Sequence, residues 1–138
     1  MATASRVLEL GAVRDAAAAV LAPVADDDPA VIAEVVDALT PPALMLVWGD
    51  PWLELGLGAP TMGPCLWTAH LQVLAIAARI EPGPGIATLE TLAAYVVERM
   101  HDDDYPWPLA SVSGPRQFLI VGVDYLGARI TYDVPVTV

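Results

Sequence analysis

CLWTAHLQVLAIAARI, residues 65–80, is followed by EPGPG, residues 81–85, and IATLETLAAYVVERM, residues 86–100, and this stretch decides the fold. The first part alternates between two faces as a strand does, with one face apolar until Arg79. The prolines and glycines of the second part interrupt regular structure. The third part repeats apolar residues at helical spacing. We therefore predict a long strand, a loop and an amphipathic helix that ends near His101.

The predicted strand is longer than most strands of compact domains. Its 16 residues would span about 50 Å at the rise of a strand. We expect it to bend, or to project beyond the body of the domain as an arm. A helix is the competing prediction for its alanine-rich half, residues 74–79.

After the helix, the chain is predicted to be mostly β. A linker that contains two prolines leads into strands predicted at residues 109–113, 116–123 and 126–138. A turn is expected near Asp124, and the last strand has the cleanest alternation in the chain. Pro135 cannot donate a ladder hydrogen bond, so we expect the end of this strand to lie at a sheet edge.

The N-terminal part is predicted to be helical. Residues 5–22 carry one apolar stripe, and Ser5 and Pro23 suit the start and the end of a helix. For residues 26–39 a second helix is favoured, although two β-branched pairs there also suit a strand. The next three segments are predicted as a short buried strand, a turn, and a loop or loose hairpin arm, at residues 43–48, 49–52 and 53–64.

A chain of 138 residues usually forms a single core, so we expect one domain, residues 1–138. Apolar residues make up 56% of the chain, a surplus for a small domain. No uncharged apolar run is long enough for a spanning helix, so we expect no membrane partner. The surplus therefore favours a subunit whose apolar surface is covered in a larger assembly.

The charge balance argues against a sequence-reading DNA-binding protein. The chain has 17 acidic and six basic residues, no lysine, and a net charge of −11. Such proteins need a basic patch to neutralise phosphates. Acidic surface usually serves solubility. The more specific interpretation is a wall that nucleic acid passes without sticking.

Targeting and redox signals are weak. The small apolar segment 16–24 follows no net positive charge, so we do not expect a signal peptide. The single cysteine, Cys65, excludes an intrachain disulfide, and a buried thiol is expected.

No active site, cofactor or metal site is predicted. Cys65 and His70 lie five residues apart in a strand and so face opposite sides. His101 with Asp102, Asp103 and Asp104 offers ligands to a divalent cation, which leaves a small metal-dependent enzyme as an alternative. A solvated helix end is the favoured interpretation, because the spacing matches no known metal loop.

Four segments carry a resemblance to a known family. They are PPALMLVWGDPWLE, LQVLAIAARIEPGPGIATLETLAAYVVERM, YPWPLASVSGPRQF and LGARITYDVPVTV, within residues 40–138. Together they resemble the tail terminator proteins of siphophages, especially those of actinobacterial hosts. The N-terminal helix fits the same order of elements.

The resemblance implies a small α+β domain with a mainly antiparallel sheet flanked by two or three helices. It also implies a structural virion protein without enzymatic activity. It implies a hexameric ring on the head-proximal end of the tail tube, assembled in the host cytoplasm. This ring would stop tube polymerisation, contact the major tail tube protein on one face and a head-completion or stopper protein on the other, and let DNA pass through its lumen. Another head–tail connector or tail protein (a stopper, a tail completion protein or a tube subunit) is the alternative.

Sheet extension between subunits and a head-to-tail ring are the expected mode of assembly. Tryptophan is enriched at interface anchor positions. The expected interface residues are the aromatic anchors Trp52, Tyr105 and Trp107 and the ion-pairing Arg79 and Arg116, and the expected lumen residues are Asp102, Asp103 and Asp104.

Overall fold

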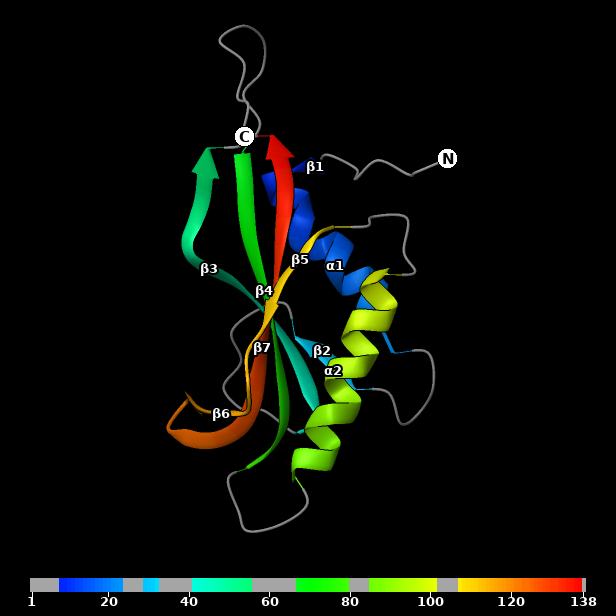
Figure 1. The fold of residues 1–138 in the computed structure, drawn as a ribbon, viewed down its shortest axis with the longest axis vertical. Helices are drawn as coiled ribbons and strands as arrows, with labels where there is room; N and C mark the ends of the chain where they lie inside the picture. The colour runs from blue at the N-terminus through cyan, green and yellow to red at the C-terminus, as the bar shows by residue number, and fades with distance from the viewer. Residues whose placement is uncertain are drawn as a thin grey trace, which may run out of the picture.

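The computed structural model describes residues 8–23, 29–32, 41–55, 67–79, 85–101 and 107–137. Its elements in chain order are β1 (Leu8–Glu9), the 3-10 turn η1 (Leu10–Ala12), α1 (Val13–Leu21), β2 (Ala30–Ile32), β3 (Ala43–Leu55), β4 (Trp67–Arg79), α2 (Gly85–His101), β5 (Leu109–Val112), β6 (Arg116–Ile120) and β7 (Val123–Thr137). One sheet contains all seven strands, and both helices lie on the same side of it (Figure 1). The prediction of an α+β fold is confirmed.

The sheet is mixed and is built around two long strands. Its order is β1-β7-β4-β3-β2, and β5 and β6 also pair with β7. Because β4 occupies one edge of β7, the strands β6, β5 and β1 follow one another along its other edge. The pairs β3–β4, β4–β7, β5–β7 and β6–β7 are antiparallel, whereas β1–β7 and β2–β3 are parallel.

The main core lies between the sheet and the two helices. Alternate residues of β4, from Ala69 to Ala77, face this core and are buried. The apolar stripe of α2 contributes Leu89, Leu92, Val96 and Met100. The long strand and the amphipathic helix predicted from residues 65–101 are therefore both present. The helix proposed as a competitor for residues 74–79 is wrong, because this part of β4 is paired with both β3 and β7.

A smaller apolar cluster covers part of the opposite face. Leu74, Ile76 and Tyr125 are buried there, and Phe118 of β6 packs against them. In Figure 1 the β6–β7 hairpin curves away from the flat part of the sheet. A Cβ at Gly127 would lie 2.6 Å from the Ala75 carbonyl oxygen and 3.0 Å from Phe118. Glycine at this position therefore allows the hairpin to approach the sheet closely.

The end of α1 is tied to α2 by polar contacts. The Tyr95 hydroxyl donates to the Leu21 carbonyl at 2.9 Å, and the Arg99 guanidinium donates to the Ala22 carbonyl at 2.9 Å. The guanidinium also lies over the Tyr95 ring, 5.1 Å from its centroid. Carbonyls at a helix end have no partner within the helix. These contacts supply the partners and fix the helices against each other.

The N-terminal predictions need two corrections. The helix predicted over residues 5–22 is shorter, because Leu8 and Glu9 pair with Val136 and Thr137 as strand β1. The helix favoured for residues 26–39 is wrong at Ala30–Ile32, which pairs in parallel with β3. The β-branched residues of that segment suit the strand that forms there. Pairing with β3 therefore outweighs the local preference for a helix. The rest of residues 26–39, apart from Pro29, lies outside the described part of the chain.

β3 continues through the turn and into the loop predicted after residue 48. The strand reaches Leu55, and its pairing with β4 shifts between Trp48 and Leu53. A bulge of this kind absorbs residues that do not fit a regular ladder. Pro51 is accommodated in it, so the Gly-Asp-Pro-Trp sequence does not end the strand.

Two details of the last hairpin also differ from prediction. The turn lies at Val121 and Gly122, which have φ angles of 49° and 77°, rather than near Asp124. Two positive φ angles match the tight turn that joins twisted antiparallel strands. Pro135 does not lie at a sheet edge, because β7 has β4 on one side and β1 on the other. Only two residues of β1 pair with this end of β7, so a proline there interrupts few ladder hydrogen bonds.

Gly127→Ala should destabilise the fold by about 2 kcal/mol or more. The added methyl group would clash with the Ala75 carbonyl oxygen, which is part of the backbone and cannot move away easily. Urea unfolding of the two proteins measures this difference. Gly114→Ala is the matched control, since a Cβ at Gly114 has nothing within 4 Å. If both variants lost the same free energy of unfolding, the close approach at Gly127 would be contradicted.

Candidate functional site

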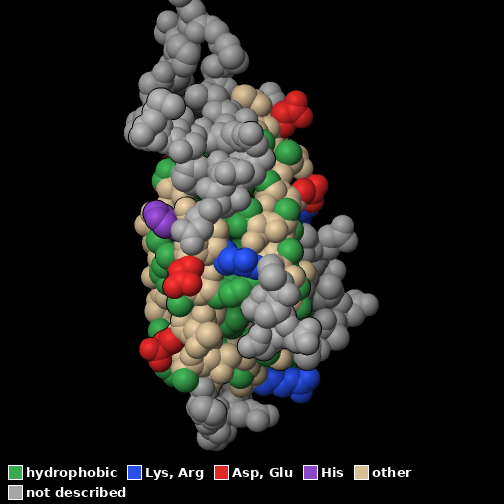
Figure 2. Space-filling view, turned by 90° about the vertical axis from the view of Figure 1, so that its right-hand side faces the viewer, with side chains coloured by type: hydrophobic (Ala, Val, Ile, Leu, Met, Phe, Trp, Pro, Cys, Tyr) green, Lys and Arg blue, Asp and Glu red, His purple; other side chains and the backbone are tan. Residues whose placement is uncertain are grey.

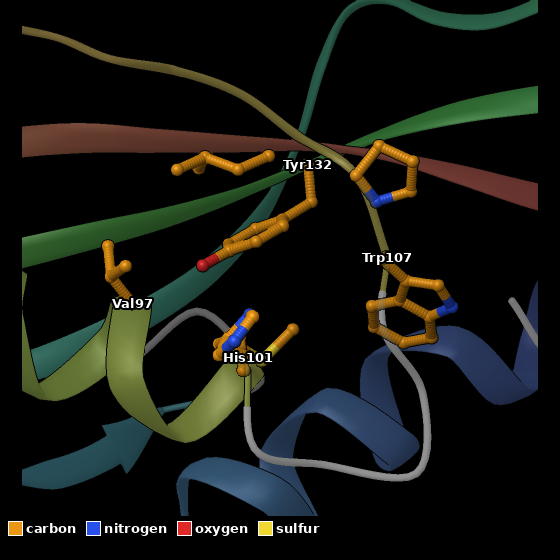
Figure 3. Close-up of a pocket in the computed structure, with 7 residues that line it drawn as sticks. Val97, His101, Trp107 and Tyr132 are labelled. Atoms are coloured by element: carbon orange, nitrogen blue, oxygen red, sulfur yellow. The ribbon is translucent and has the colours of Figure 1, made fainter. Parts of the chain in front are cut away.

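A cavity of about 300 Å³ lies between the last turn of α2 and the strands β5 and β7. Most of its lining is apolar carbon, and the His101 imidazole adds polar atoms at the end of α2 (Figure 3). The lining residues are Val97, Met100, His101, Trp107, Pro108, Leu109 and Tyr132. A mostly apolar hollow with few polar groups is the usual form of a binding site in a protein.

The lining follows from the periodicity of the elements around the cavity. Val97 and His101 lie four residues apart on α2 and therefore project to the same side of the helix. Tyr132 occupies one of the alternate positions of β7 that face the helices. Leu109 pairs with Tyr132, and the Asp133 amide donates to the Pro108 carbonyl at 3.0 Å. These bonds hold the β5 side of the cavity in place.

The Tyr132 hydroxyl is a buried polar group beside the cavity. The residue is 2% exposed, and its hydroxyl has no hydrogen-bond partner among the residues that the structure describes. Figure 3 shows its oxygen directed toward α2, between Val97 and His101. Burial raises the pKa of Tyr132 to about 12, so the phenol stays neutral and can both donate and accept a hydrogen bond. An unsatisfied buried hydroxyl costs about 1–3 kcal/mol.

A polar cluster lies on the opposite face of the sheet. His70 Nδ1 is 2.8 Å from Asp133 Oδ1, and His70 Nε2 is 3.4 Å from Glu54 Oε1. The histidine thus links β3, β4 and β7. Both ring nitrogens face a carboxylate, but neither these three side chains nor any other group of histidine, cysteine, aspartate and glutamate in the described ranges is arranged to hold a metal ion. The arrangement suits a structural role in which polar contacts hold the three strands together.

The exposed apolar side chains are gathered mainly along one border of the sheet. Leu109 and Val112 of β5, Leu119 of β6 and Val121 of the hairpin turn are all exposed, and Leu119 reaches 71%. A second hollow of about 140 Å³ lies between Val112 and the first turns of α2, where Ile86 is also exposed. Figure 2 shows apolar side chains at the surface on the helix side, among scattered charges.

The interface residues predicted from sequence are distributed over the molecule. Trp52 is 47% exposed on β3, and its ring centroid lies 5.5 Å from that of Trp48. Arg79 and Arg116 are exposed at the end of β4 and the start of β6. Trp107 is only 5% exposed and belongs to the main core, because it packs beneath the end of α2. It is therefore not placed on the surface as an anchor would be.

The remaining predicted residues are not brought together by the described structure. His101 is exposed at the end of α2 and lines the cavity. Tyr105 and the segment Asp102–Asp104 lie outside the described residues, so their predicted interface and lumen roles stay predictions.

Sequence reasoning did not single out Tyr132 or the partners of His70. A tyrosine on the buried face of an otherwise aliphatic strand was the available signal for Tyr132. No local signal joins His70 to Asp133, because 63 residues separate them along the chain.

Comparison of the chain with protein-family models and with curated proteins finds no match. Among the described helices, none combines the length and the apolar character that crossing a lipid bilayer requires.

The buried phenol predicts a specific loss of stability at alkaline pH. In the unfolded chain Tyr132 ionises near its ordinary pKa of 10, whereas the folded protein holds it protonated up to a pKa of about 12. The contribution of this group to folding therefore falls as pH rises above 10, by about 1 kcal/mol at pH 11. Between pH 9 and pH 11, the free energy of unfolding measured in urea should fall less for Tyr132→Phe than for the parent protein. An identical pH dependence in the two proteins would contradict the desolvated phenol.

Proposed function

We propose that this protein is a tail terminator of a siphophage, which closes into a hexameric ring at the head-proximal end of the tail tube. The observation that carries the proposal is the gathering of exposed apolar side chains on one border of the sheet. Monomeric proteins rarely leave such a surface uncovered. Their positions in β5, β6 and the hairpin turn suit contact with another subunit.

The order of the strands supports head-to-tail assembly. β6 and β3 lie at opposite borders of the sheet, separated by β7 and β4. Among the described strands, β2 pairs with β3 only from Ala43 to Met45, which leaves the rest of β3 with a single neighbour. An unpaired edge can accept a strand from another chain. Two different borders make a heterologous contact, and such contacts close into rings when the rotation per subunit is right.

The charge of the chain supports a ring through which DNA passes. A protein with a net charge of −11 and only six arginines offers few positive charges to bind the phosphates of DNA. The ring would contact the tail tube protein on one face and a head-completion or stopper protein on the other. It would be assembled in the host cytoplasm and remain in the virion. The proposal assigns it no enzymatic activity and no cofactor.

The proposal is tested by mixing the purified protein with tail tube subunits. We expect substoichiometric amounts to arrest tube growth, and native mass spectrometry of the protein with the tubes to show rings of six subunits. Leu119→Asp should lower arrest at least tenfold, because a charge replaces the most exposed apolar side chain of the border. Gln117→Asp on the same strand is the charge-matched control and should have a smaller effect.

Two outcomes would contradict the proposal. A protein that stays monomeric and leaves tube growth unchanged is not a terminator. A protein that adds to the growing tube and continues it would instead be a tube subunit. Urea unfolding of each variant checks that it is folded.

A further inference from the structure

We propose that His70, Glu54 and Asp133 form a latch, which fastens the outer end of β3 when the imidazole takes up a second proton and releases it when this proton is lost. The outer end of β3 is residues 53–55, beyond the bulge. This inference does not rest on the proposed function, because it concerns the folded subunit alone. It adds a response to pH to a cluster that links three strands.

The imidazole of His70 lies between two carboxylates from the neighbouring strands. Nδ1 is 2.8 Å from Asp133 Oδ1 of β7, which is an ordinary hydrogen-bond length. Nε2 is 3.4 Å from Glu54 Oε1 of β3, within ion-pair distance, but it is buried and makes no hydrogen bond to any described residue. The contact with Asp133 is thus complete, whereas the contact with Glu54 is not.

The number of protons on the ring explains this asymmetry. A neutral imidazole has one N–H and one bare nitrogen, whereas the imidazolium has two N–H groups, and ionised carboxylates can only accept. The shorter contact assigns the single proton of the neutral ring to Nδ1, which donates it to Asp133. The lone pair of Nε2 then faces the oxygen of Glu54. A second proton, on Nε2, turns this repulsive contact between two acceptors into a charge-assisted hydrogen bond.

The charged groups around the ring favour this response. β7 contributes Asp133, and β3 contributes Glu54 and, in the exposed bulge, Asp50. Arg129 is the described cation on this face of β7, but it lies four residues from Asp133, or about 13 Å along the strand, where salt screens most of its effect. The described residues that flank His70 on the same face of β4 are uncharged, namely Thr68 and Gln72. The nearest described charges are therefore negative.

The outer end of β3 is attached by few backbone contacts. Beyond the bulge, residues 53–55 form three pairs with β4, and among the described strands β2 reaches β3 only at residues 43–45. At the bulge, a Cβ on Gly49 would lie 3.0 Å from the Cβ of His70, so the backbone of β3 passes close to the histidine. Strand ends with few contacts open readily. The contact of Glu54 with His70 thus adds a side-chain tie where the backbone supplies little.

The direction of the effect follows from the proton count. Histidine is the side chain that ordinarily gains its charge between pH 8 and pH 5, whereas carboxylates stay ionised over most of this range. The latch is closed in the protonated state, so the outer end of β3 is held more firmly at pH 5.5 and loosens as the pH rises. Trp52 belongs to the adjoining bulge and is 47% exposed. The same proton therefore sets how firmly this aromatic side chain is held at the border of the sheet.

The experiment is amide hydrogen exchange of the full chain at pH 5.5 and pH 7.5, followed by NMR and corrected for the intrinsic exchange rate at each pH. Protection of residues 53–55 and of their partners in β4 should be about threefold to tenfold higher at pH 5.5, as one charge-assisted hydrogen bond to a partly exposed carboxylate predicts. Residues 44–46, before the bulge, are the internal reference and should not change. Nitrogen chemical shifts of His70 should place its proton on Nδ1 at pH 7.5.

Glu54→Gln separates the latch from other effects of pH. Its amide can donate to the bare Nε2 of the neutral ring, so protection of the outer end should change less than twofold between the two pH values. His70→Gln should likewise lose the pH dependence. The matched controls are Glu98→Gln, at an exposed carboxylate of α2, and His101→Gln, which removes the other histidine of the chain. Both controls should keep the pH dependence of the parent protein.

Three results would overturn the inference. The first is equal protection of the outer end of β3 at the two pH values in the parent protein. The second is a pH dependence that survives in Glu54→Gln or in His70→Gln, and the third is a proton on Nε2 of His70 at pH 7.5. Urea unfolding checks that each variant is folded. Arrest of tube growth is measured separately, so the latch and the proposed function fail independently of each other.

Discussion

The pairing of β4 with β7 is the constraint on which the rest of the structure depends. The two strands run antiparallel from the pair Trp67–Val136 to the pair Arg79–Tyr125, with one irregularity between Ile76 and Ala78. Because side chains alternate along both strands, this register fixes which residues face the helices and which face away. A shift of one residue would move the core side chains of both strands to the wrong face. β3 is added to the outer edge of β4, and β1, β5 and β6 are added to the outer edge of β7, while β2 lies beyond β3.

A long strand pair creates two faces, and this chain covers them unequally. Both helices cover one face, where the main core forms. On the other face the β6–β7 hairpin covers only the end near Ile76, and His70, Asp133 and Glu54 occupy the region toward the opposite end. The apolar side chains that fit neither face are left at the border formed by β5 and β6. Of the six large hydrophobic side chains that are exposed in the described residues, four lie at this border.

Sequence reasoning succeeded where the pattern was long and periodic. The alternation of residues 65–80 and the stripe of residues 86–101 each predicted an element to within two or three residues at either end. It failed where distant contacts override local preference. Leu8 and Glu9 become a strand only because β7 offers an edge more than 120 residues away along the chain, and the extension of β3 through Pro51 depends on the bulge against β4.

The site was less predictable than the fold for the same reason. Trp52 was recognisable from sequence as an exposed aromatic in a glycine- and proline-rich setting. The cavity was not, because α2, β5 and β7 meet there only after folding. Tyr132 lies on the buried face expected for it, but periodicity says nothing about whether its hydroxyl finds a partner. That question depends on how Pro108 and Leu109 cross the end of α2.

Two features of the described residues conflict with local rules. The buried Tyr132 hydroxyl has no hydrogen-bond partner among these residues, and the Trp52 side chain is about half exposed. Natural sequences usually satisfy buried polar groups, and exceptions require an explanation. Conflicts between local rules and the fold tend to lie at functional positions. The phenol is enclosed by its own chain, so a neighbouring subunit would not reach its oxygen, whereas the half-exposed tryptophan remains available for a contact between subunits.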